Sequence, residues 1–128
     1  KKSYRPSFCI LVYPVISMKD KLTHLGSKNS LLGSFPTDEE VHFFSNELQI
    51  SAEKTPPTLL IHAIDDAVVI PENSILYHKA LQENKIPTRL HLMEQGGHGF
   101  GIKNALAPTN SWLKITKEWL KNQKIIAH

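Results

Sequence analysis

Three strand-like runs predict the β-strands of this chain. Phe8–Tyr13 is continuously apolar and ends at Pro14, a pattern typical of a strand buried on both faces of a parallel sheet. Thr58–Ala63 has the same character. Thr88–Met93 alternates polar and apolar residues, which predicts a half-exposed strand nearer the edge of the sheet.

Helix signals lie between and after these runs. The segment 15–36 is polar and predicts at most a short helical turn around Ser30–Leu32. Thr37–Glu40 has the pattern of a capping box, so a helix is expected to begin there and to continue to about Asn46. This helix is expected to bury Val41 and Phe44.

Two further helices are expected in the second half of the chain. Pro71 opens one of about three turns, which ends before Pro87. The last begins at 108–110, and its buried face is expected to contain Trp112, Leu113, Ile115, Trp119 and Leu120. Because strand, helix and strand in this order form the parallel crossover unit, we expect an α/β fold of three parallel strands with flanking helices.

Length and composition fit one globular domain. The chain has 128 residues, of which 41% are hydrophobic and 21% charged. The net charge of +3 comes from scattered lysines without interleaved aromatic residues, so no nucleic-acid partner is predicted. No apolar run approaches the length of a membrane span, and no membrane partner is predicted. Cys9, the single cysteine, is expected to be a buried, inert thiol.

The start of the chain is unusual. It begins at Lys1 rather than at methionine, shows no signal-peptide regions, and enters the first predicted strand almost at once. We therefore expect it to be the later part of a longer protein. The sequence leaves the compartment open.

Polar groups follow the second and third predicted strands. Asp65 and Asp66 come just after Thr58–Ala63, and His98 lies in the run Gly96–Phe100 after Thr88–Met93. Neighbouring strands are about 5 Å apart, so side chains at their carboxyl ends can meet. A carboxylate that orients a histidine is the acid and base part of a hydrolase relay.

Simpler interpretations remain for each residue. The glycines around His98 also fit a turn with a bystander histidine, and Asp65 and Asp66 also fit a polar turn that caps the next helix. The sequence has no His-Glu-x-x-His motif, paired cysteines or close carboxylate–histidine cluster, so neither a metal nor another cofactor is predicted.

The same residues carry a family resemblance. Ile61–Ser74, followed by Gly96–Phe100, resembles the α/β-hydrolase esterases, and most closely the branch of acetyl-xylan and feruloyl esterases and lipase-like proteins of polysaccharide-degrading bacteria. Leu11–Ser17, Ser30–Gly33 and Phe44–Leu48 are also similar to that branch. The resemblance implies that the chain is the C-terminal portion of a doubly wound α/β-hydrolase sheet. A secreted or periplasmic location would fit the family.

By this resemblance Asp66 is the acid of a catalytic triad, with Asp65 as the fallback, and His98 is the general base. Family members carry a Gly-x-Ser-x-Gly nucleophile motif upstream of these strands, and this chain has no such motif. The oxyanion-hole loop of the family also lies upstream. No nucleophile is therefore assigned in the chain, and residues 1–128 alone are expected to be inactive.

The resemblance implies a carboxyl-ester substrate, either acylated plant polysaccharide or a small acyl ester. The first strand, within Phe8–Tyr13, would normally pair with an upstream strand, so its edge is expected to recruit the upstream half of the protein or a second copy. Two alternatives are a prolyl-oligopeptidase-type serine peptidase, which ends in similar motifs, and a non-catalytic α/β module that binds a carbohydrate or a partner.

Overall fold

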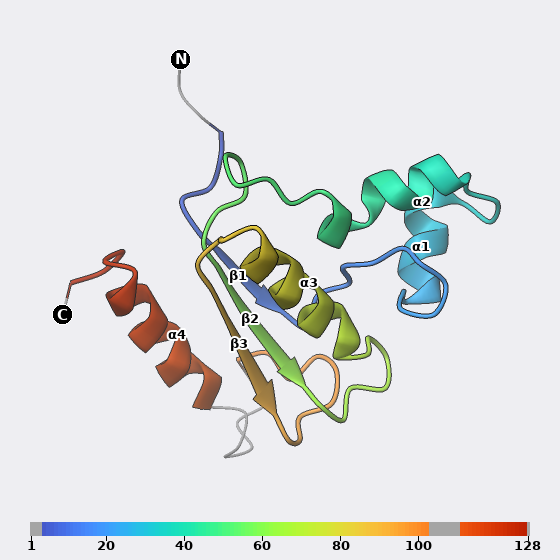
Figure 1. Ribbon diagram of the computed structural model, residues 1–128. Helices are drawn as coiled ribbons and strands as arrows, with labels where there is room; N and C mark the ends of the chain where they lie inside the picture. The colour runs from blue at the N-terminus through green and yellow to red at the C-terminus, as the bar shows by residue number, and fades with distance from the viewer. Residues whose placement is uncertain (1–3, 103–110, 128) are drawn as a thin grey trace.

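The computed structural model describes residues 4–102 and 111–127, and its core is a parallel sheet (Figure 1). The strands are β1 (Cys9–Val12), β2 (Thr58–Ala63) and β3 (Thr88–Met93), in the order β1-β2-β3. Both pairs are parallel, and Leu59 lies opposite Ile10 on one side and Arg89 on the other. The predicted three-stranded parallel sheet is confirmed.

The middle strand β2 has a different partner on each face. All six of its residues are buried. Leu59 and Ile61 pack with Trp112 and Trp119 of α4 (Ser111–Asn122). Leu60 packs on the opposite face, with Leu81 of α3 (Glu72–Glu83) and with Ile86 just after that helix. Helices therefore cover both faces of the sheet, as the doubly wound arrangement requires. Each fully buried leucine or isoleucine contributes about 1.5–3 kcal/mol of transfer free energy.

The outer strands are less buried than β2. In β3 every residue except Met93 is only partly buried, which confirms its predicted position near an edge of the described sheet. All four residues of β1 are partly buried too. Cys9 is among them, so the expectation of a buried thiol was wrong, although partial burial still raises the pKa of this group. Each of these strands has one neighbour in the sheet of the described residues, which leaves its side chains incompletely covered.

The polar segment after β1 contains a full helix. α1 (Leu25–Leu32) has eight residues, so the expectation of one short turn was wrong. The His24 side chain caps it by accepting the backbone N–H of Ser27, and Gly33, with φ of 78°, ends it. Histidine is an uncommon N-cap residue, which explains why the sequence pattern did not reveal the start of this helix.

The next helix has the predicted capping box. α2 (Asp38–Phe44) begins after Thr37, whose Oγ1 accepts the backbone N–H of Glu40 at 3.2 Å. The Glu40 carboxylate in turn accepts the backbone N–H of Thr37 at 2.8 Å. A 3₁₀ turn, η1 (Asn46–Leu48), follows and packs against α3.

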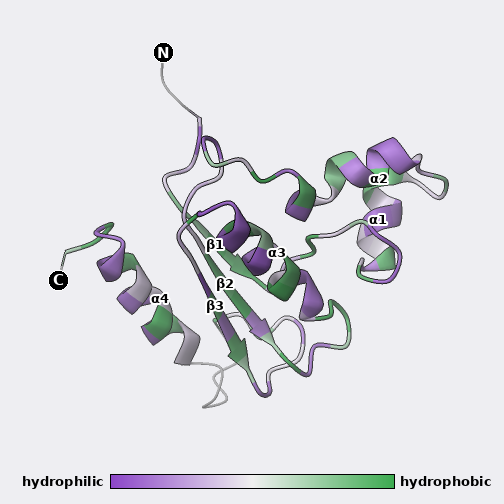
Figure 2. Ribbon diagram, in the orientation of Figure 1, coloured by the Kyte–Doolittle hydropathy of each residue, from purple (hydrophilic) through white to green (hydrophobic). Residues whose placement is uncertain are grey.

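The predicted burial of α2 was wrong. No residue of this helix is buried, and Phe43 and Phe44 are 64% and 37% exposed. Figures 1 and 2 show why: α1 and α2 lie apart from the sheet, so the hydrophobic residues of α2 do not reach the core.

The last helix has most of its predicted buried face. Trp112 and Trp119 are buried, and Ile115 and Leu120 pack partly buried against the same cluster. Leu113 is exposed, contrary to expectation. The predicted start at 108–110 lies outside the described residues.

Candidate active site

The carboxyl ends of β2 and β3 bring Asp66 and His98 together. Asp66 lies in the turn after β2, and His98 lies in the glycine-rich loop after β3. The Nδ1 atom of His98 is 2.8 Å from Oδ2 of Asp66. Asp66 is only 3% exposed, whereas the His98 side chain is 30% exposed. A shielded carboxylate thus faces one side of an imidazole that remains accessible to solvent.

The Asp66 carboxylate is fixed by its own turn. Its Oδ1 atom accepts the backbone N–H groups of Val68 and Val69, each at 2.9 Å. This side-chain turn leaves Oδ2 directed at His98. Burial of the carboxylate raises its pKa, but the hydrogen bonds from His98, Val69 and Val68, together with the charge of His98, outweigh that effect. The pKa of Asp66 therefore lies below its ordinary value, which keeps the group ionised at neutral pH.

Asp65 has a different role in the structure. Its Oδ1 atom accepts the backbone N–H of Gly97 at 2.8 Å, and no hydrogen bond of the described residues joins it to His98. The geometric partner of His98 is therefore Asp66, and Asp65 fastens the glycine-rich loop to the end of β2.

The glycines of this loop allow backbone angles that place His98 at the sheet edge. Gly97 and Gly99 have φ of 60° and 78°, in the left-handed region that other residues rarely adopt. Gly96 packs closely: a Cβ there would lie 3.3 Å from the Cβ of Ala63. The loop therefore turns sharply on both sides of the histidine.

Tyr13 also belongs to the site, and sequence reasoning did not single it out. Its ring centroid lies 4.7 Å from that of His98 and 4.8 Å from that of Phe100, the latter edge-on. Its φ of 41° is unusual for a bulky residue, and its backbone N–H donates to Ile61 O at 2.8 Å. The signal was its position at the carboxyl end of the strand next to β2.

His62 is a second residue that was overlooked. It is fully buried in β2, and its Nε2 atom lies 2.8 Å from Val69 O and 3.2 Å from Oδ2 of Asp66. Its Nδ1 atom lies 2.7 Å from Oγ of Ser74. A histidine inside an apolar strand, four residues before the aspartate, was the available sequence signal.

No hydrogen bond of the described residues involves Nε2, the second ring nitrogen of His98. None of their hydrogen bonds joins a serine hydroxyl to His98, and the buried Ser17, Ser45 and Ser74 are bonded elsewhere. Over the ranges 4–102 and 111–127, no group of three or more potential metal ligands was found. In the same ranges no helix has both the length and the apolar character needed to cross a bilayer.

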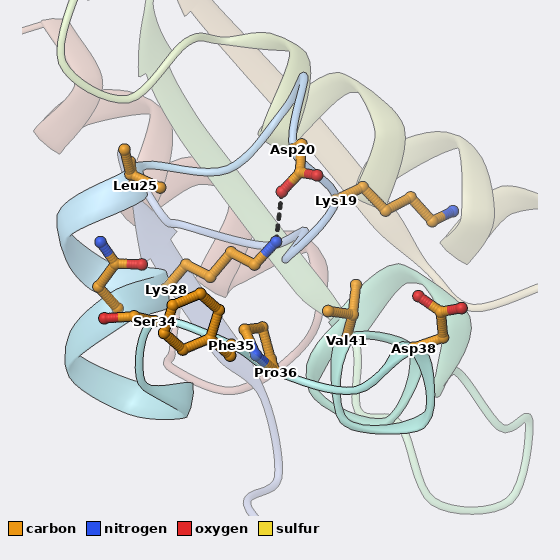
Figure 3. A pocket seen from close by; sticks show the side chains of 10 residues that line it. Lys19, Asp20, Leu25, Lys28, Ser34, Phe35, Pro36, Asp38 and Val41 are labelled. Carbon is orange, nitrogen blue, oxygen red and sulfur yellow. Dashed lines mark hydrogen bonds and ion pairs between the residues drawn. The ribbon is translucent and has the colours of Figure 1, made fainter.

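A cavity of about 600 Å³ lies beside α1 and α2 (Figure 3). Its lining mixes charged, polar and aromatic side chains: Lys19, Asp20, Leu25, Lys28, Asn29, Ser34, Phe35, Pro36, Asp38 and Val41. The ammonium group of Lys28 is paired with Asp20, and the Lys28 side chain is largely buried. Neither Asp66 nor His98 lines this cavity.

Three parallel strands, helices on both faces, and an aspartate–histidine contact at the ends of the last two strands fit the α/β-hydrolase class. Residues 8–124 match the prolyl oligopeptidase family, and the chain belongs to this family.

Relatives with high similarity include two bacterial proteins. Endo-1,4-beta-xylanase B of Butyrivibrio fibrisolvens is 43% identical over 102 residues, or 80% of this chain and 16% of that protein. The acetylxylan esterase of Xylanibacter ruminicola is 31% identical over 121 residues, or 92% of this chain and 25% of that protein. The chain thus spans a quarter or less of each relative's length.

A solved structure is also closely similar. The acetyl ester-xyloside bifunctional hydrolase of Caldicellulosiruptor lactoaceticus superposes with a TM-score of 0.91 at 37% identity, covering 96% of this chain and 44% of that one. The predicted resemblance to the esterases is confirmed by these relatives. The predicted alternative, a peptidase, is matched only at the level of the family.

Proposed function

We propose that this chain carries the acid and the general base of a serine carboxyl-ester hydrolase. The observation that carries the proposal is the 2.8 Å contact between His98 Nδ1 and Asp66 Oδ2 at the carboxyl ends of adjacent parallel strands. With Nδ1 directed at the carboxylate, Nε2 is the ring nitrogen available to exchange a proton with a nucleophile. Asp66 holds the tautomer and stabilises the imidazolium that forms.

The reaction follows from these roles. Nε2 of His98 accepts the proton of a serine hydroxyl as its oxygen bonds to the ester carbonyl carbon, whose π electrons move to the carbonyl oxygen. When the tetrahedral intermediate collapses, the C–O bond to the alcohol breaks and His98 protonates the departing oxygen. Water then cleaves the acyl-enzyme by the same two steps, which regenerates the serine.

We propose that the serine and the oxyanion-hole donors of this mechanism lie in an upstream segment. We assign residues 1–128 to the C-terminal portion of one α/β-hydrolase domain, supported by the alignment of nearly the whole chain with 44% of the solved relative. On this assignment the isolated chain is inactive, because it lacks both nucleophile activation and oxyanion stabilisation.

The proposed substrates are acyl groups on plant polysaccharide, or small acyl esters. Support comes from the relatives, whose names refer to acetylxylan and to acetyl ester-xyloside. The cavity beside α1 and α2 supports a role for the segment 15–36 in substrate choice, because its lining combines the exposed ring of Phe35 with polar groups such as Asn29. Small-molecule sites typically combine aromatic and apolar side chains with a few polar groups that fix the ligand.

The experiment is fluorophosphonate labelling of the full-length protein that contains this chain, and of its His98→Ala variant, read by intact mass and peptide mapping. We expect an adduct on an upstream serine that is lost in the variant. Absence of an adduct from both proteins would contradict the proposal and favour a non-catalytic binding module. An unchanged adduct in His98→Ala would remove the assigned role of His98.

A serine peptidase is the second candidate, favoured specifically by the match to the prolyl oligopeptidase family. The labelling result would be the same for both enzymes, so substrate assays must separate them. We expect the full-length protein to cleave p-nitrophenyl acetate and acetylated xylan but not a prolyl peptide amide. Preferential cleavage of the peptide would reverse this assignment.

A further inference from the structure

His62 has no role in the mechanism proposed for Asp66 and His98, although its Nε2 atom lies 3.2 Å from Oδ2 of Asp66. It is fully buried in the middle of β2, surrounded on its strand by apolar residues. Placing an imidazole in such a position costs free energy unless both ring nitrogens have partners. Both do, which makes His62 a structured polar group in an otherwise apolar core.

The surroundings of His62 decide which ring nitrogen carries the proton. Nε2 faces two oxygen atoms: the carbonyl of Val69 at 2.8 Å and Oδ2 of Asp66 at 3.2 Å. A carbonyl and an ionised carboxylate have no hydrogen to donate, so a lone pair on Nε2 would face only negative partial charge. Nε2 must therefore be protonated, and in the neutral ring Nδ1 accepts the hydroxyl proton of Ser74.

These contacts connect three elements. Ser74 lies in the first turn of α3 and is fully buried, so it holds the imidazole of His62 from the helix side. His62 Nε2–H holds the Val69 carbonyl, and the Val69 N–H holds Oδ1 of Asp66. The same Nε2–H places the positive end of its dipole beside Oδ2, the oxygen that faces His98.

We propose that His62, oriented by Ser74, is a positioning residue that sets the Asp66 carboxylate for His98. The inference rests on the proposed function, since it assigns a role in the same reaction. His62 does not contact the substrate. It acts by fixing the turn 66–69 and by holding its Nε2–H close to Oδ2, the oxygen that faces His98.

The first test is independent of catalysis. Spectra of the full-length protein with ¹⁵N-labelled histidine rings, assigned through a His62→Gln variant, report the tautomer of His62. We expect protonation at Nε2, with Nδ1 unprotonated. A ring protonated only at Nδ1 would overturn the proposal, even if the protein proves not to be an esterase.

The second test compares His62→Leu, which removes the proton donor, with His62→Gln, whose side-chain amide can place an N–H near the same oxygens. In metal sites, loss of a group that orients a ligand from behind typically lowers activity about 10- to 100-fold. We expect a fall of that size in kcat for His62→Leu, with KM for p-nitrophenyl acetate unchanged, a smaller fall for Ser74→Ala, and substantial recovery in His62→Gln.

A control separates positioning from loss of stability. Leu81→Val truncates a buried side chain that packs on the same face of β2, without altering a polar contact of Asp66. We expect it to lower the melting temperature and leave kcat unchanged. Equal falls in kcat for Leu81→Val and His62→Leu at equal stability loss would overturn the proposal.

The low-field proton resonance of the His98 Nδ1–H completes the test and does not require enzyme activity. We expect it to shift in His62→Leu and Ser74→Ala but not in Leu81→Val. An unchanged resonance in the two site variants would overturn the positioning role even if the full-length protein shows no esterase activity.

Discussion

At the scale of single residues, the site depends on keeping one buried carboxylate ionised. Asp66 loses hydration by burial, which on its own would favour the protonated form. Backbone N–H groups on Oδ1 and the His98 imidazole on Oδ2 replace that hydration with fixed dipoles. The replacement is pre-formed, so no reorganisation is needed when His98 acquires a proton.

This arrangement predicts how stability changes with pH. Because the folded pKa of Asp66 is lowered, its ionised form stabilises the protein fully above the unfolded value of about 3.9, and this contribution is lost as the pH falls through the folded pKa. We expect the unfolding free energy of the full-length protein to exceed that of Asp66→Asn most at neutral pH, with the difference narrowing below about pH 4. Denaturant titrations at several pH values measure it. A difference independent of pH would contradict the prediction.

At the scale of elements, α2 is a helix held largely by its own N-terminus. Its residues are not buried, so packing against the core stabilises it little. Its capping box, in contrast, provides hydrogen-bond acceptors for the backbone N–H groups of both Thr37 and Glu40. Two of its residues, Asp38 and Val41, also line the cavity beside α1. The shape of that cavity is therefore coupled to a helix of low expected stability.

The capping box gives a direct prediction for this helix. Thr37→Ala removes the acceptor for the Glu40 N–H and should cost about 1 kcal/mol. Because α2 has little contact with the core, we expect the loss mainly in local opening, seen as faster amide exchange within residues 38–44. Thr37→Ser retains the hydroxyl and is the matched control. Faster exchange throughout β2 as well would show that α2 is not a separate unit.

At the scale of the whole molecule, the sheet has an open side at β1. This strand pairs only with β2 among the described residues, and its side chains are partly exposed. An unpaired strand edge presents backbone donors and acceptors to any other strand. The upstream half of the domain is our proposed natural partner for this edge.

The corresponding prediction concerns the isolated chain. We expect residues 1–128 to be oligomeric by light scattering, and to form a one-to-one complex when the upstream half is supplied as a separate chain. A monomer at all accessible concentrations, with no binding of the upstream half, would contradict the assignment of this edge.

The sequence predicted the parts of this structure that depend on local pattern. The bounds of β2 and β3 were confirmed to the residue, because a short apolar run and a strictly alternating run are both strand signals. The proximity of Asp66 and His98 followed from the order of the elements. Whether these two residues catalyse a reaction stays a prediction.

Other features depend on contacts that a single sequence does not encode locally. The sequence of α2 contains apolar residues but does not say that the helix lies apart from the sheet, so the burial of Phe44 was wrongly predicted. Tyr13 and His62 were missed because their importance comes from residues distant in sequence: His98 in one case, Val69 and Ser74 in the other. A histidine or tyrosine within a strand carries no local mark of such a role.

Successive side chains of β2 point to opposite faces of the sheet, and this alternation determines which mutations the fold tolerates. Substitutions along the strand alter one contact at a time, and several conservative changes are tolerable in a well-packed core. Inserting or deleting a single codon is different, because every side chain beyond it changes face. Ile61 would then point toward α3 and His62 toward the tryptophans of α4, so the core and the support for Asp66 would fail together. Descendants of this gene should accordingly vary in β2 by replacement while keeping its length constant.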